Sequence, residues 1–205
     1  SVIAIDADGQ PRVTDHILDN QLSRFGTATE LEVVQHDGWT YVLAAGGDDG
    51  VSLFALGPTG RLVHLDTIES AVPLMLDSIS GMAAAIAQDG NLQVLLAQHT
   101  AQGFAQLEVD LSGQGVVRSG TGGTVSGTDR GDMLVGSAGA DTLEGGAGND
   151  ILEDGAGQEV LRGGEGDDIF VLVSDGQRDV IDGFRVNEDR IDLSDVPFLY
   201  SLDQI

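Results

Sequence analysis

The 205-residue chain is strongly acidic, with 34 Asp and Glu against nine Lys and Arg and a formal net charge of −25. Such a chain is a poor partner for nucleic acid or for an anionic membrane surface. It contains no cysteine, which excludes a disulfide framework. No run of apolar residues is long enough to predict a transmembrane segment.

Residues 1–117 contain a weak internal repeat of short apolar segments separated by Gly- and Asp-rich turns. Trp39–Ala45 aligns with Asn91–Ala97 at a spacing of 52, and Val51–Leu56 aligns with Phe104–Val109 at 53. The pattern predicts strands at 30–35, 40–45, 51–56, 61–66, 82–88, 92–98, 104–109 and 115–118. Four strands in about 50 residues are typical of a β-propeller blade, although a small β-sandwich would also fit.

Residues 1–117 resemble the β-propellers of lactonase-like proteins. Only about two and a half blades are present, whereas propellers usually close with about four to eight. The first predicted strand, Ile3–Asp8, also begins in what would be the middle of a blade. We therefore expect the chain to be a piece of a longer protein, or to be completed by other protein chains.

Five consecutive nonapeptides run from Gly127 to Val171, with the sequences GTDRGDMLV, GSAGADTLE, GGAGNDILE, DGAGQEVLR and GGEGDDIFV. Each divides into a six-residue turn and a three-residue strand whose middle residue is apolar. Side chains alternate between the faces of a strand, so this residue should point inward. These middle residues are Leu134, Leu143, Leu152, Leu161 and Phe170. A flexible Gly/Asp-rich linker, the alternative, has no such fixed apolar position.

The sixth residue of each nonapeptide is a carboxylate: Asp132, Asp141, Asp150, Glu159 and Asp168. Carboxylate and carbonyl oxygens in an open turn suit Ca²⁺, which takes about 6–8 oxygen ligands. The repeats hold neither Cys nor His, which argues against zinc or copper. The repeats therefore favour a calcium-binding function.

The third and fifth nonapeptides match G-G-x-G-x-D-x-U-x at every specified position, and the tract resembles the RTX (repeats-in-toxin, haemolysin-type) calcium-binding repeats. This resemblance implies a parallel β-roll with two repeats per coil and calcium between successive turns on one side. It pairs Asp132 with Asp150, Asp150 with Asp168, and Asp141 with Glu159. A fourth pair, Glu159 with Asp179, follows if residues 174–179 form a displaced further turn. The expected total is three or four ions.

Backbone carbonyls would supply the remaining ligands, and the turn glycines are the candidates to position them: Gly127, Gly136, Gly139, Gly145, Gly148, Gly163 and Gly166. Three residues depart from the family pattern. Arg130 replaces a glycine, Asp154 opens the fourth repeat, and Glu159 replaces aspartate. The Asp141/Glu159 site should therefore be weaker.

After the repeats, 179–184 and 189–194 resemble the strand–turn–strand segment that covers the open end of an RTX roll. An exposed sheet edge invites pairing with other chains, so a cap is physically useful. One more acidic loop is the alternative. The predicted fold is therefore all-β, with a partial propeller-like region (1–117), a parallel calcium-binding β-roll (118–171) and a C-terminal β cap (172–205).

Residues 118–205 carry a net charge of −13, which opposes compaction until cations neutralise it. Calcium binding should therefore drive folding of this part. All nine basic residues are Arg, a composition that fits a GC-rich bacterial coding sequence. The resemblance implies export by type I secretion and a location outside the cell or at its surface. The expected role is structural or adhesive. The alternative is the non-catalytic portion of a secreted hydrolase whose active site lies outside this chain. No enzyme is predicted within these residues, because neither H-E-x-x-H nor G-x-S-x-G occurs.

Overall fold

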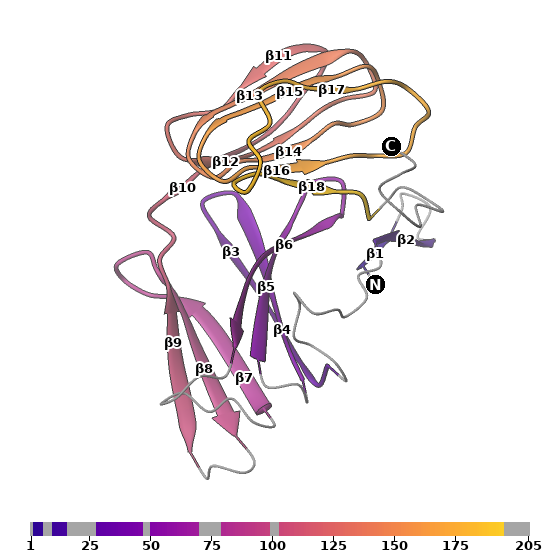
Figure 1. The fold of residues 1–205 in the computed structure, drawn as a ribbon. Coiled ribbons are helices and arrows are strands. Elements are labelled where there is room, and N and C mark those ends of the chain that lie inside the picture. The colour runs from indigo at the N-terminus through magenta and orange to yellow at the C-terminus, as the bar shows by residue number, and fades with distance from the viewer. Residues whose placement is uncertain are drawn as a thin grey trace. The chain divides into compact units, whose positions relative to one another are not determined.

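The computed structural model describes residues 2–5, 10–15, 28–46, 50–69, 79–98 and 103–194. The chain divides into two compact units, Ser1–Ser112 and Gly113–Ile205. Every regular element among the described residues is a β-strand (Figure 1), as the predicted all-β class requires. The described residues include no helix with the length and hydropathy needed to cross a membrane.

The described residues of the first unit form three antiparallel sheets whose strands follow one another in chain order. The four-stranded sheet consists of β3 (Glu30–His36), β4 (Trp39–Ala45), β5 (Gly50–Leu56) and β6 (Leu62–Glu69). The three-stranded sheet consists of β7 (Ile79–Ile86), β8 (Leu92–Gln98) and β9 (Phe104–Val109). Strand β1 (Val2–Ile5) pairs antiparallel with β2 (Pro11–Asp15).

Turn chemistry and burial explain the four-stranded sheet. Asp37 and Gly38, both with positive φ, form the two-residue turn between β3 and β4, as tight hairpins require. Strand β4 is buried along nearly its whole length, and the Trp39 and Tyr41 rings stack with centroids 6.0 Å apart. A sheet of four consecutive antiparallel strands is consistent with the predicted blade.

The two larger sheets of this unit contact each other through their first strands, β3 and β7. The Thr29 hydroxyl, just before β3, donates to the carbonyl of Ile79 at 3.4 Å.

One predicted strand was assigned to the wrong unit. The strand expected at 115–118 to complete a second blade exists, but it pairs in parallel with residues 131–135 and belongs to the second unit.

The second unit is a β-roll of two facing parallel sheets (Figure 1). One sheet contains β10 (Gln114–Ser119), β12 (Gly131–Val135), β14 (Ile151–Glu153), β16 (Ile169–Val171) and β18 (Arg190–Asp192). The other contains β11 (Gly123–Ser126), β13 (Asp141–Ala147), β15 (Val160–Glu165) and β17 (Val180–Ile181). Consecutive strands alternate between the sheets, so one coil uses two nonapeptides.

The strand register confirms the predicted parallel roll. Met133 pairs with Ile151, and Ile151 pairs with Ile169, each 18 residues further along the chain. On the opposite sheet Thr142 pairs with Val160 at the same spacing. Equivalent positions of alternate repeats therefore stack directly on one another.

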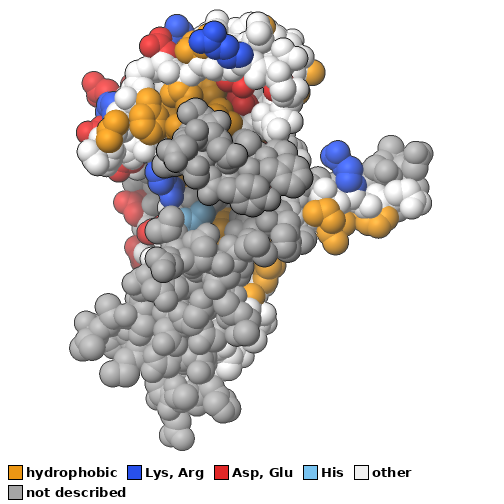
Figure 2. Space-filling view, turned by 45° about the vertical axis from the view of Figure 1, so that its right-hand side comes forward, with side chains coloured by type: hydrophobic (Ala, Val, Ile, Leu, Met, Phe, Trp, Pro, Cys, Tyr) orange, Lys and Arg blue, Asp and Glu red, His pale blue; other side chains and the backbone are white. Residues whose placement is uncertain are grey.

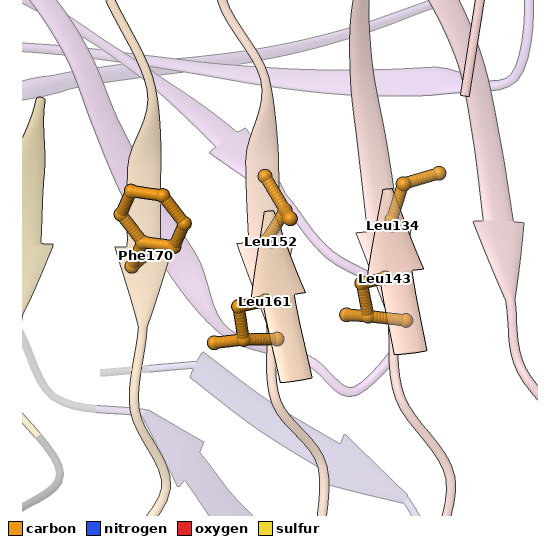
Figure 3. Packing of buried hydrophobic residues seen from close by; sticks show 5 residues of the cluster. All are labelled: Leu134, Leu143, Leu152, Leu161 and Phe170. Carbon is orange, nitrogen blue, oxygen red and sulfur yellow. The ribbon is translucent and has the colours of Figure 1, made fainter. Parts of the chain in front are cut away.

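The core of the roll is a ladder of the predicted inward residues, each at most 1% exposed (Figure 3): Leu134, Leu143, Leu152, Leu161 and Phe170. Leu134, Leu152 and Phe170 come from one sheet, and Leu143 and Leu161 come from the other. Because each side chain fills the space between the sheets, the ladder fixes their separation. It also holds the turns at both edges in register.

The segment predicted as a cap contributes two further strands within its described part, 172–194. The rest of the prediction, residues 195–205, lies outside the described residues. Strand β17 pairs with β15 and β18 pairs with β16, so both sheets are extended by one strand. The Phe184 ring lies 6.0 Å from the ring of Phe170, centroid to centroid.

Figure 2 shows charged side chains of both signs around apolar ones on the roll surface. The exposed large apolar residues of this unit include Val180, Phe184, Val186 and Ile191.

Candidate metal centre

The carboxylate at the sixth position of every nonapeptide is buried. Asp132, Asp141, Asp150, Glu159 and Asp168 are all at most 3% exposed. A buried carboxylate is costly unless its charge and its hydrogen-bonding capacity are satisfied. Four of these side chains nevertheless retain an oxygen without a hydrogen-bond partner among the described residues: Asp141 Oδ1, Asp150 Oδ2, Glu159 Oε1 and Asp168 Oδ2. Bound cations would satisfy them.

The other oxygens of Asp150 and Asp168 link successive turns. The Asp132 N–H donates to Asp150 Oδ1 at 2.7 Å, and the Asp150 N–H donates to Asp168 Oδ1 at 3.0 Å. On the opposite side, the Glu159 N–H donates to Asp179 Oδ1 at 3.0 Å. The structure thus brings together three of the four predicted pairs through a main-chain donor. Each carboxylate is held in a fixed orientation by this bond.

Carboxylate oxygens face main-chain carbonyls across spaces that only glycine leaves open. A Cβ at Gly145 would collide with Asp150 Oδ2 and with the carbonyl oxygen of Gly163 in the next turn. At Gly127 the obstacles would be Asp132 Oδ2 and the carbonyl oxygen of Gly145. Carboxylate and carbonyl oxygens of adjacent turns therefore converge. This all-oxygen donor set is the kind that calcium prefers.

The opposite side repeats this arrangement with changes. A Cβ at Gly157 would meet Glu159 Oε1 and the carbonyl oxygen of Gly139, and one at Gly136 would meet the carbonyl oxygen of Asp154. Asp141 makes no hydrogen bond with Glu159 in the described structure and accepts instead from Ser137 N and Oγ, each at 2.7 Å. The predicted Asp141/Glu159 pair is therefore less tightly organised than the pairs on the first side.

The remaining predicted glycines lie at the same stacked turns. Gly148 and Gly166 have φ of +105° and +120°, and a Cβ at Gly166 would overlap the Gly148 carbonyl. A Cβ at Gly163 would overlap Asp168 Oδ2. In the described part of the chain, no three His, Cys, Asp or Glu side chains converge as a metal-binding group.

Asp189 is a buried carboxylate that sequence reasoning missed. It is 9% exposed, and its Oδ1 accepts the Asp168 N–H at 3.1 Å. It directly precedes β18, just as Asp168 precedes β16. The sequence signal was Asp189-Arg190-Ile191, a carboxylate followed by a strand with an apolar middle residue. Its distance of 21 residues from Asp168, instead of 18, concealed it.

Burial shifts the ionisation of these carboxyl groups. It raises the pKa of Asp150 to about 8, with the charges of Asp168 and Asp132 adding to the effect and the Asp132 N–H opposing it. Burial likewise raises the pKa of Glu159 to about 7 and that of Asp168 above its ordinary value. A cation between the turns would reverse these shifts, because an adjacent positive charge favours the carboxylate form. Protons and calcium should therefore compete for the site.

Replacing Gly146 by alanine is expected to destabilise the roll more than the same change at Gly122. Both have positive φ, +117° and +100°, which costs an L-residue about 1–2 kcal/mol. A Cβ at Gly146 would also overlap the carbonyl of Thr128, whereas nothing lies within 4 Å at Gly122. Urea unfolding in saturating calcium measures the difference. Equal losses would show that close stacking of the turns contributes nothing.

Comparison with known families agrees with this geometry. The family model of the RTX calcium-binding nonapeptide repeat matches the chain in four copies, over residues 126–158, 135–170 and 153–183. Residues 126–183 are therefore RTX repeats, folded as the parallel roll described above. Neither the comparison with curated proteins nor that with solved structures gives a match.

Proposed function

We propose that the roll of this RTX-type protein binds three or four calcium ions between its turns and that binding drives its folding. The observation that carries the proposal is the set of buried carboxylate oxygens without hydrogen-bond partners, such as Asp150 Oδ2, beside the carbonyls of the next turn. The donor set fits the hard, flexible coordination of calcium. The proposed side-chain ligands of the calcium ions are Asp132, Asp141, Asp150, Glu159 and Asp168, with Asp179 at the C-terminal end.

Calcium would supply the charge that the folded roll lacks. Residues 118–205 have a net charge of −13, and several of the carboxylates are buried. Without cations, mutual repulsion and desolvation oppose the compact state. Each ion would lie between two turns and would offset both the mutual repulsion and the cost of desolvation. Metal binding and folding are therefore one coupled equilibrium.

The setting that suits this equilibrium lies outside the cell. Extracellular calcium-binding modules typically have a Kd of about 10⁻⁴–10⁻³ M, so their sites stay empty where free calcium is scarce. We propose a secreted or cell-surface bacterial protein that leaves its cell unfolded by type I secretion and folds in external calcium. Its role would be structural or adhesive and non-enzymatic, with the propeller-like unit completed by other protein chains.

Hydrogen–deuterium exchange of the full chain tests calcium-driven folding. In chelator, amides of residues 131–171 should exchange rapidly, and about 1–10 mM calcium should protect them. Magnesium at the same concentration should protect them much less, because it demands a smaller octahedral shell. Strand β4, which carries no predicted ligand, is the internal control and should be protected throughout. Roll amides already protected in chelator, or unprotected at saturating calcium, would contradict the proposal.

A further inference from the structure

Beyond the predicted ligands, the last described turn of the roll has the geometry of a repeat that its sequence hardly resembles. Residues 184–192 place Asp189 at the sixth position and β18 at the last three. The Arg185 N–H donates to Asp189 Oδ2 at 2.7 Å. The same bond joins the second and sixth positions of an earlier repeat, where the Ser137 N–H donates to Asp141 Oδ2 at 2.7 Å. Arg185 thus occupies the second position of a degenerate repeat.

The Arg185 side chain reaches back to the preceding turn. Its Nη2 donates to the carbonyl oxygen of Gly166 and lies 3.8 Å from Asp168 Oδ2 and 3.6 Å from Asp189 Oδ1. The Asp168 and Asp189 side chains are at most 1% exposed, while that of Arg185 is 33% exposed. On the outer side, Nη1 pairs with Glu188 at 3.0 Å. The guanidinium group therefore lies among oxygens of two successive turns.

One of these oxygens, Asp168 Oδ2, corresponds to an oxygen of a predicted calcium site one turn earlier. There, Asp150 Oδ2 faces the carbonyl of Gly163 and has no hydrogen-bond partner among the described residues. Asp168 Oδ2 is the equivalent atom 18 residues later, and the positive group that faces it is Arg185. A metal ion is thus expected beside Asp150 Oδ2, whereas a side-chain cation lies beside the equivalent Asp168 Oδ2 in the next turn.

We infer that the guanidinium group of Arg185 takes the place of a calcium ion at the C-terminal end of this side of the roll. The inference rests on the proposed binding of calcium by the repeats. Arginine suits the role because it stays charged at all relevant pH values and presents several planar N–H donors. As part of the chain, it offsets part of the negative charge of Asp168 and Asp189 at any calcium concentration. This turn therefore needs no ion at this position.

An ordinary surface ion pair is the competing explanation, and burial distinguishes the two. Exposed pairs contribute little, as expected for Arg162 with Glu144 at 3.3 Å and with Asp182 at 2.9 Å. Asp168 and Asp189 are buried, so removal of their cation leaves uncompensated charge in the interior. Another cation should then be recruited to the position. Arg162 provides a matched control in the same unit.

Native mass spectrometry of the full chain, counting calcium ions at saturation, tests the inference. Asp189→Asn should leave the wild-type count unchanged, because no ion binds beside Asp189 in the wild type. Arg185→Gln should bind one ion more than the wild type, since the freed oxygens accept calcium. The control Arg162→Gln should keep the wild-type count.

Loss of one ion in Asp189→Asn would overturn the inference, because calcium would then occupy the position in the wild type. An unchanged count in Arg185→Gln would also overturn it, because the position would not attract a cation. If Arg185→Gln does not fold, Arg185→Lys decides: its retained charge should give a folded protein with the wild-type count. An unfolded Arg185→Lys, or one with a different count, would refute the inference. A wild type that binds no calcium would instead refute the proposed function.

Discussion

Asp150→Asn is expected to weaken calcium binding by the roll about 10- to 100-fold. The change removes the charge of a ligand whose Oδ2 has no hydrogen-bond partner in the described structure. Interactions with a charged group are worth roughly 1.5–3 kcal/mol, and about 1.4 kcal/mol corresponds to a tenfold change in affinity. Asparagine keeps Oδ1, the acceptor of the Asp132 N–H at 2.7 Å, so the link between turns can persist. The midpoint of the calcium titration, followed by far-UV circular dichroism, measures the effect.

In chelator, where no calcium is bound, the same substitution should stabilise the folded roll. Burial raises the pKa of Asp150 from 3.8 to about 8, so the folded roll binds this proton more tightly than the unfolded chain does. Between these pH values, the metal-free wild type must lose stability as pH rises. Asparagine cannot ionise, so Asp150→Asn should lack this contribution and retain more β-structure than the wild type near pH 8. A pH series in chelator checks the sign.

Asp167→Asn is the matched control for both experiments. Asp167 is exposed in the turn of the last full-consensus repeat, and its substitution changes the net charge by the same amount. Both of its curves should follow those of the wild type. If the two variants shift the calcium midpoint equally, Asp150 acts only through net charge and is not a ligand.

Leu152→Ala is expected to lower the free energy of unfolding of the roll by about 2–5 kcal/mol in saturating calcium. Leu152 is fully buried and pairs with Leu134 on one side and Phe170 on the other. Its truncation leaves a cavity in the middle of the ladder, and the neighbouring strands are tied by their register and cannot easily collapse into it. Urea unfolding, followed by hydrogen exchange of residues 133–171, measures the loss.

The contrasting substitution is Val186→Ala, since Val186 is 76% exposed. This change should alter the free energy of unfolding by less than about 0.5 kcal/mol. Neither substitution removes a carboxylate, so both variants should bind as many ions as the wild type. A similar loss of stability in the two would mean that the leucine ladder is not the core of the roll.

The central part of the roll could be predicted from the sequence because one period governs every layer. A nonapeptide with a fixed apolar residue and a fixed carboxylate places Leu134, Leu152 and Phe170 in one stack and Asp132, Asp150 and Asp168 in another. Local turn chemistry, strand alternation and register all favour the same structure there. The candidate ligands were therefore identifiable as residue types at known positions.

The ends of the roll could be predicted only in part, because the period changes there. Val117 pairs with Met133 at a spacing of 16, so β10 was mistaken for the end of a blade. Asp189 follows Asp168 by 21 residues, which hid the last turn and the contacts of Arg185. Insertions and deletions in turns change the spacing without breaking the sheets, because loops accommodate length changes more easily than strands do. Pattern matching at a fixed spacing misses such turns.

The aspartate hydrogen bonds give the roll the character of a one-dimensional array. Each of these N–H groups donates to the carboxylate of the next turn, as Asp132 does to Asp150 and Asp150 does to Asp168. In such an array stability is approximately a sum of nearest-neighbour terms, and order spreads from turn to turn. An ion that fixes one carboxylate also prepares the acceptor for its neighbour. The array should thus respond to calcium cooperatively, over a narrower range of concentration than independent sites would.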